Sequence, residues 1–197
     1  LREVKPDVVL GMGGYASAPG GVAAWLLRIP LVLHEQNAVA GMSNRFLSHF
    51  ATRTLSAFPG AFSKRVTHEV VGNPLRSDII AIENVMPAQP ATSKKVLVVG
   101  GSLGAKILND VVPQAMKQIK VQSIDGWHQT GGGNEQTVLK SYQDYGLPEE
   151  KVKVTEFIDD MAAAYQWADV VICRAGALTV SELAMAAKPA IFVPLPH

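Results

Sequence analysis

Residues 168–182 read ADVVICRAGALTVSE, and this stretch decides the fold. Its first half is a short apolar run over residues 169–173, typical of a strand that is buried on both faces of a parallel sheet. A glycine-centred turn over residues 174–177 follows, and residues 178–187 favour a helix. A strand, tight turn and helix in this order place backbone N–H groups and the positive end of a helix dipole at the carboxyl edge of a sheet. Such an edge can hold a phosphate or pyrophosphate.

Two polar residues flank this turn. Arg174 offers a cation for phosphate oxygens, and Glu182 offers a carboxylate that can accept two hydroxyls of a ribose. A simpler alternative stays open, in which Gly176 only permits close packing of the helix against the strand.

Composition describes a folded protein with room for a buried core. The 197 residues are 48% hydrophobic and 18% charged, which excludes a disordered chain. No apolar run approaches the roughly 20 residues that cross a bilayer. The single cysteine, Cys173, excludes an internal disulfide and fits a reducing compartment. Because the first residue is not Met and the last residues follow a strand-like run directly, we expect a piece of a longer polypeptide.

The small net charge conceals two halves of opposite sign. Residues 1–76 carry eight Lys or Arg and four Asp or Glu, whereas residues 77–197 carry ten and thirteen. A basic first half favours an anionic partner such as phosphate or membrane lipid, although a solvated surface explains the excess equally well.

The strand–glycine–helix unit recurs along the chain. Glycine turns at residues 11–14 and 100–104 each follow a strand-like run and precede a helical pattern. The first lacks the dinucleotide fingerprint G-x-G-x-x-G, and the second is not a Walker loop, because Lys followed by Ser or Thr does not come after its last glycine. Further strands are expected at residues 31–33, 52–57, 69–71, 123–129, 152–157 and 189–193. Helices are expected at residues 20–28, 42–50, 77–84, 106–118, 134–145 and 158–167. The turn cluster GNPLR at residues 72–76 marks a domain boundary, which predicts two α/β domains over residues 1–75 and 76–197.

Several polar residues have both a functional and a structural interpretation. HEQN at residues 34–37 follows a strand, where open α/β sheets bind ligands, yet Glu35 and Asn37 are also suited to cap the next helix. Ser102 can donate to a phosphate oxygen or cap a helix. The Asp159–Asp160 pair is expected to cap a helix rather than to bind a metal.

Six motifs in this order resemble the GT-B glycosyltransferases of the MurG family, and the resemblance covers essentially the whole chain. They are GMGGYASAP (11–19), HEQN (34–37), GNPLR (72–76), GGSLGA (100–105), FIDDM (157–161) and CRAGALTVSE (173–182). The resemblance implies a GT-B architecture, in which two Rossmann-like parallel-sheet domains face a cleft.

The activity implied by the resemblance is transfer of N-acetylglucosamine, with inversion, from UDP-N-acetylglucosamine to the muramyl 4-hydroxyl of lipid I, giving lipid II. No cofactor, metal or nucleic acid is implied, and the location is peripheral, at the cytoplasmic face of the bacterial plasma membrane. The donor-binding residues matched by motif are Arg76, Ser102, Phe157, Ile158, Met161, Arg174, Gly176, Ala177, Leu178, Thr179 and Glu182. Those matched on the acceptor side are Tyr15, Glu35 and Asn37, with Glu35 also the in-chain candidate for the catalytic base.

In the family, a glycine-rich loop with a histidine would lie before Leu1, and paired glutamines would lie after His197. We therefore expect the 197-residue chain to show no turnover. An anionic membrane surface is a further implied partner. The basic residues that would meet it are Arg28, Arg45, Arg53, Lys64 and Arg65, beside apolar Leu26, Leu27, Ile29, Phe46 and Leu47, which otherwise belong to the core. The alternatives are a UDP-sugar 2-epimerase of the same fold and a non-catalytic nucleotide-binding module.

Overall fold

The computed structural model describes residues 1–82, 93–101, 103–119 and 124–194. The chain divides into two compact units, Leu1–Pro74 and Leu75–His197. This division lies one residue from the predicted one. Both units are α/β with parallel strands, so the predicted fold class is confirmed.

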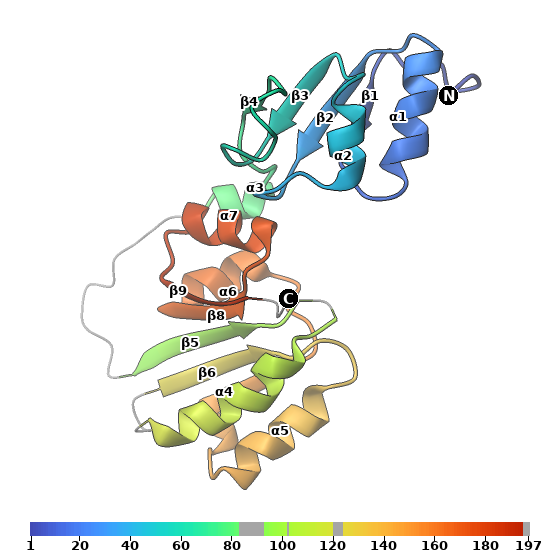
Figure 1. Cartoon of the computed structure of the whole chain (residues 1–197). Helices are drawn as coiled ribbons and strands as arrows, with labels where there is room; N and C mark the ends of the chain where they lie inside the picture. Colours follow the sequence, from blue (N-terminus) through green and yellow to red (C-terminus); the bar gives the residue numbers. More distant parts are fainter. Residues whose placement is uncertain (83–92, 102, 120–123, 195–197) are drawn as a thin grey trace. The chain divides into compact units, whose positions relative to one another are not determined.

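Unit 1 contains a four-stranded parallel sheet in the order β1-β2-β3-β4 (Figure 1). Its elements in chain order are β1 (Val9–Gly11), α1 (Ser17–Leu26), β2 (Leu31–Glu35), α2 (Met42–Leu47), β3 (Arg53–Ser56) and β4 (Glu69–Val70). Leu31, Leu33 and Leu47 form its buried core between β2 and α2. Helix α2 is shorter than predicted because residues 48–50 continue only as a tightened turn, in which Phe50 N–H donates to the Leu47 carbonyl.

Unit 2 contains a five-stranded parallel sheet in the order β7-β6-β5-β8-β9. Its strands are β5 (Lys94–Val99), β6 (Ile124–Gln129), β7 (Val152–Thr155), β8 (Val170–Arg174) and β9 (Ala190–Val193). Its helices are α3 (Ser77–Ile80), α4 (Lys106–Gln118), α5 (Glu135–Asp144), α6 (Met161–Trp167) and α7 (Ala177–Met185), with a 3₁₀ turn, η2, at Glu149–Lys151.

Two apolar layers sandwich this sheet. Helices α4 and α5 cover one face, whereas α6 and α7 cover the other, with α3 packed against them (Figure 1). The chain runs from β5 to β6 on one side and later returns to β8 on the other side of β5. The strand order therefore reverses between β5 and β8, and open α/β sheets bind ligands at the carboxyl ends of the strands at such a point.

Candidate functional site

A pocket lies at the carboxyl ends of β5 and β8. Its volume is about 870 Å³. Pairing of Val99 with Cys173 aligns the ends of the two strands, so the predicted glycine turns at 100–104 and 174–176 both line this pocket. The lining residues are Gly100, Gly104, Ala105, Lys106, Ile107, Asp110, Arg174, Ala175, Gly176 and Pro194.

Helix α7 begins at the rim of this pocket. Its N-cap residue is Gly176, and no side chain caps the helix. The positive end of the helix dipole therefore lies beside Arg174, which ends β8 and lines the same pocket. A cation and a helix N-terminus together favour an anionic group such as a diphosphate.

The glycine turn after β5 is held in place by the end of β6. The Gln129 side chain accepts from Gly101 N–H at 3.1 Å and donates to the Gly101 carbonyl at 3.2 Å. Gly104 has φ +73°, and a Cβ there would lie 2.2 Å from the Thr130 carbonyl oxygen. Only glycine fits at this point, since the backbones of the two turns are in direct contact.

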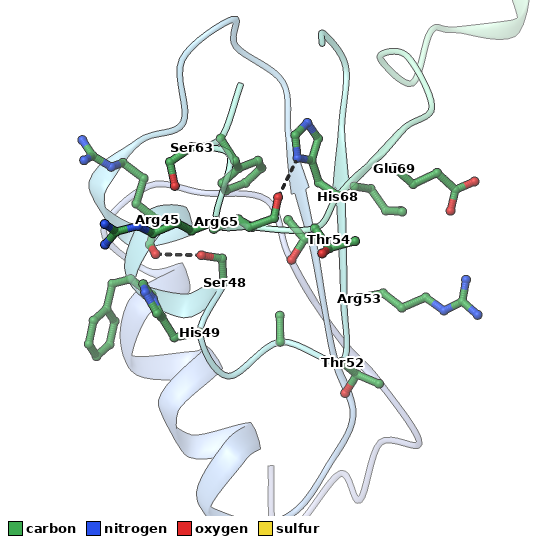
Figure 2. A pocket seen from close by; sticks show the side chains of 16 residues that line it. Arg45, Ser48, His49, Thr52, Arg53, Thr54, Ser63, Arg65, His68 and Glu69 are labelled. Carbon is green, nitrogen blue, oxygen red and sulfur yellow. Dashed lines mark hydrogen bonds between the residues drawn. The ribbon is translucent and has the colours of Figure 1, made fainter. Parts of the chain in front are cut away.

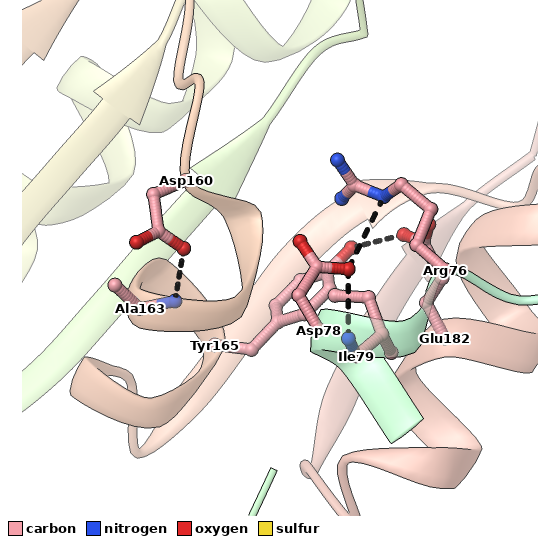
Figure 3. Close-up of polar contacts among 7 residues, drawn as sticks. All are labelled: Arg76, Asp78, Ile79, Asp160, Ala163, Tyr165 and Glu182. Atoms are coloured by element: carbon pink, nitrogen blue, oxygen red, sulfur yellow. Dashed lines mark hydrogen bonds and ion pairs between the residues drawn. The ribbon is translucent and has the colours of Figure 1, made fainter. Parts of the chain in front are cut away.

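Arg76, which precedes α3, lies close to Asp78 of α3, Tyr165 of α6 and Glu182 of α7 in unit 2 (Figure 3). The Tyr165 hydroxyl donates to Glu182 Oε2 at 2.9 Å, and Arg76 Nε lies 3.8 Å from Asp78 Oδ1. Burial, together with the adjacent Glu182 carboxylate, raises the pKa of Tyr165, and Arg76 partly opposes this. The structure thus brings together the predicted donor residues Arg76 and Glu182, with Tyr165 as an unpredicted third partner.

The loop after β7 carries three more predicted donor residues. Ile158 and Met161 are half-buried and pack against the core beneath α6, whereas Phe157 is exposed and lies over Gly132. Asp160 Oδ1 accepts from Ala163 N–H at 2.8 Å and caps α6, which confirms the expected capping role for Asp160 of the acidic pair. Leu178 and Thr179 lie in the first turn of α7, while Ser102 is outside the described residues.

Glu35, the candidate base, is buried and fully hydrogen-bonded. Its Oε1 accepts from the Asn37 backbone N–H and side-chain amide, and its Oε2 accepts from Gly41 N–H and the Asn44 amide, all at 2.9–3.1 Å. Burial alone would raise the pKa of Glu35, but these hydrogen bonds outweigh it and hold the pKa below its ordinary value. A carboxylate stabilised in its charged form is a poor proton acceptor, so the geometry gives Glu35 a structural role and argues against its assignment as base.

Two of the unit 1 motifs contact each other. His34 bonds through Nε2 to the Gly72 carbonyl at 2.9 Å, and Asn73 donates from its side-chain amide to the Gln36 carbonyl at 3.1 Å. The predicted acceptor residue Tyr15 is 94% exposed in the glycine turn after β1. Asn37 is also exposed, although its backbone N–H and its side-chain amide both donate to Glu35.

A second pocket, of about 970 Å³, opens in unit 1 beside β3 (Figure 2). Arg45, Arg53, Arg65, His49 and His68 are among its lining residues. Within the described part of the chain, none of the three arginines forms an ion pair. Leu47, expected beside the membrane, is buried in the core, so that part of the predicted surface is wrong.

Buried polar residues that sequence reasoning missed support both units. Asn44 donates to Glu35 and to the His34 carbonyl, and Asn109 links His128 to the Thr130 carbonyl. A helical wheel would have found Asn44, because it shares the buried face of α2 with Leu47. Among the described residues, no group of three or more His, Cys, Asp or Glu could hold a metal ion. Likewise, none of the described helices has the length and apolar character needed to traverse a bilayer.

Comparisons with known protein families and with individual relatives indicate the same family. The glycosyltransferase family 28 C-terminal domain matches residues 95–197, and the family 28 N-terminal domain matches residues 1–56. A UDP-N-acetylglucosamine–N-acetylmuramyl-(pentapeptide) pyrophosphoryl-undecaprenol N-acetylglucosamine transferase of Colwellia psychrerythraea is 59% identical over 203 residues, which cover 100% of this chain and 52% of the relative.

Solved structures agree with this match. The crystal structure of Acinetobacter baumannii MurG matches with a TM-score of 0.81 and 41% identity, over 99% of this chain and 54% of that one. A putative UDP-N-acetylglucosamine 2-epimerase of Listeria monocytogenes shares the fold, with a TM-score of 0.69 and 14% identity over 100% of this chain and 59% of that one. The chain thus spans about half the length of these relatives, and it belongs to glycosyltransferase family 28.

Proposed function

We propose that this chain is part of an inverting glycosyltransferase that moves N-acetylglucosamine from UDP-N-acetylglucosamine to the muramyl 4-hydroxyl of lipid I, forming lipid II. The observation that carries the proposal is the pocket between the ends of β5 and β8, where Arg174 and the N-terminus of α7 lie together in a family 28 chain. The substrates named for the 59% identical relative support the same reaction.

The chemistry of the leaving group fits this pocket. When the bond between the sugar anomeric carbon and the diphosphate oxygen breaks, negative charge develops on UDP. In this proposal the helix dipole of α7 and the guanidinium of Arg174 stabilise that charge without a metal ion. The acceptor hydroxyl attacks the opposite face of the sugar and loses its proton to a base, a role for which Glu35 is poorly suited.

Unit 2 would bind the donor nucleotide. In this proposal the turn at the start of α7 and Arg76 contact the diphosphate, and Glu182 accepts hydrogen bonds from the ribose. The Ile158 backbone reads the uracil edge, with Phe157 and Met161 beside it. Tyr15 and Asn37 of unit 1 would serve the acceptor.

Titration of the chain with UDP, UDP-N-acetylglucosamine and NAD tests this assignment. We expect binding of the two uridine nucleotides, with loss of affinity in Arg76→Ala and Glu182→Ala, and no preference for NAD. Lys117→Ala, on the last turn of α4, is the matched surface control. Preference for NAD, or no nucleotide binding, would contradict the proposal, and formation of the C2 epimer of the donor sugar by the full-length protein would favour an epimerase.

An anionic membrane surface is the second proposed partner, through unit 1. Arg45, Arg53 and Arg65 line one pocket without an ion-pair partner among the described residues, so an anionic ligand would relieve their mutual repulsion. Phe46 lines the same pocket, is exposed and packs edge to face on Phe50, with ring centroids 5.3 Å apart. Basic and exposed aromatic side chains in one region are typical of a surface that binds anionic lipid.

Sedimentation with phosphatidylglycerol and phosphatidylcholine vesicles tests this surface. Binding should require the anionic lipid, weaken with salt and fall in the double variant Arg45→Glu/Arg65→Glu. The unit 2 variant Lys117→Glu should bind as the unchanged chain does. Binding that is insensitive to salt and to the charge reversal would count against the surface.

A further inference from the structure

Tyr165 is buried in the core of unit 2, with only its hydroxyl engaged in a polar contact. Its side chain is 1% exposed and packs in the same cluster as Ile79 and Leu183. A buried hydroxyl needs a hydrogen-bond partner, and this one donates to Glu182 Oε2 at 2.9 Å. The ring is rigidly held by its packing, so the position of its hydroxyl is set by the core rather than by solvent.

This contact restricts the carboxylate of Glu182. Glutamate has several rotatable bonds, and a half-buried carboxylate on a helix surface would otherwise sample several rotamers. The hydrogen bond holds one oxygen, Oε2, against Tyr165. Within the part of the chain that the structure describes, Oε1 has no hydrogen-bond donor, so it is available to accept from a ligand.

Arg76 lies beside Tyr165 and Glu182, and its positive charge makes this cluster suitable for a nucleotide. Arg76 is close enough to Tyr165 to oppose the rise of its pKa, and its guanidinium is half exposed beside Asp78. A cation for phosphate and an oriented carboxylate for hydroxyls therefore lie within one cluster (Figure 3).

We propose that Tyr165 is a positioning residue, which anchors Oε2 of Glu182 so that Oε1 accepts a hydrogen bond from a ribose hydroxyl of a bound uridine nucleotide. This inference rests on the proposed function, because it takes Glu182 as the ribose-binding carboxylate. Tyr165 does not itself contact the ribose. Removal of its hydroxyl should therefore act on the discrimination between ribose and deoxyribose, and a purely structural hydroxyl would leave that discrimination unchanged.

The test is calorimetric titration of the chain with UDP and with 2′-deoxy- and 3′-deoxy-UDP. We expect the unchanged chain to prefer UDP by about tenfold over at least one deoxy analogue, the effect of one hydrogen bond to a charged group. Tyr165→Phe should lower this preference by about threefold or more, mainly by lowering the affinity of the chain for UDP. In the Glu182→Ala background Tyr165→Phe should change the preference no further, because residues that act as one unit are not additive.

Tyr142→Phe is the matched control, since Tyr142 is an equally buried tyrosine whose hydroxyl contacts His128 on the other face of the sheet. It should keep the full preference for UDP. Thermal unfolding of each variant shows whether the fold is retained, and if Tyr165→Phe fails to fold, Glu182→Gln replaces it and should lower the same preference. A normal preference in folded Tyr165→Phe overturns the positioning role alone. A normal preference in Glu182→Gln overturns the ribose contact assigned to Glu182 together with the positioning role, and an unchanged chain that binds no UDP overturns the proposed function as a whole.

Discussion

His128 lies in a buried polar network that requires its neutral form. Its side chain has no exposed surface, and its Nε2 and Nδ1 lie 3.1 Å from Asn109 Oδ1 and 2.9 Å from the Tyr142 hydroxyl. Asn109 donates its amide to the Thr130 carbonyl, so its Oδ1 must accept from His128 Nε2–H. The Nδ1 atom then accepts from the Tyr142 hydroxyl, and a second proton on the ring would reverse that bond and leave the Tyr142 O–H without this acceptor. Desolvation by burial lowers the pKa of His128 from 6.5 to about 4.

This shift makes the free energy of unfolding depend on pH. The pKa of His128 is lower in the folded state than in the unfolded state. The stability that its neutral form contributes is therefore fully present above the unfolded pKa of 6.5 and is lost as the pH falls toward the folded pKa of about 4. At about pH 5 nearly every unfolded chain, but only about one folded chain in ten, carries the proton. The resulting loss in the free energy of unfolding of unit 2, relative to about pH 7.5, is about 2 kcal/mol.

Urea unfolding followed by tryptophan fluorescence measures this loss. A Trp25→Phe background restricts the signal to Trp127 and Trp167, both of which lie in unit 2. In that background His128→Gln should reduce the pH-dependent loss by about 2 kcal/mol, and the surface variant His49→Gln should leave it unchanged. The same pH dependence with and without His128 would refute the reasoning.

Three further changes have definite expected outcomes. Gly104→Ala should lower the free energy of unfolding by about 3 kcal/mol or more. The control Gly60→Ala should lower it by only about 1 kcal/mol, because Gly60 has a similar φ of +79° but no atom lies within 4 Å of the position its Cβ would take. Equal losses for the two variants in urea unfolding would contradict this prediction. The Cys173 thiol, buried with its pKa raised to about 11 by desolvation, should resist Ellman's reagent in buffer and react in urea, and rapid native labelling would show the burial to be wrong. Removal of the α6 cap in Asp160→Ala should cost about 1 kcal/mol in the same unfolding assay, whereas Asp159→Ala should cost little.

Local patterns were sufficient to predict most of the secondary structure. The apolar run before each glycine turn became a parallel strand, and the helix predicted over residues 106–118 has those bounds in α4. Hydrophobic periodicity and turn chemistry are properties of neighbouring residues, so the sequence displays them directly. The end of α2 was misplaced because fraying of a last turn into 3₁₀ geometry has no comparable local signal.

The role of Glu35 could not be predicted for a different reason. A polar residue at the carboxyl end of a strand is equally compatible with a ligand site and with a structural anchor. The outcome depends on whether a later segment supplies donors to the carboxylate, and here Gly41 and Asn44 do so. Such tertiary contacts decide the pKa of a carboxylate, and sequence spacing does not contain them.

The position of the unit 2 pocket is a property of the fold, whereas its chemistry is a property of the side chains. A 2-epimerase with 14% identity has the same fold, so a pocket at the end of β5 and β8 does not by itself select a transferase. In the proposed function, the groups that select the ligand are Arg174 at the end of β8 and Glu182, which Tyr165 holds near Arg76. These residues come from separate elements, and only packing of α3, α6 and α7 on one face of the sheet brings the last three together. Loss of ribose discrimination in Tyr165→Phe with an intact fold would therefore tie nucleotide binding to this cluster and not to the shared architecture.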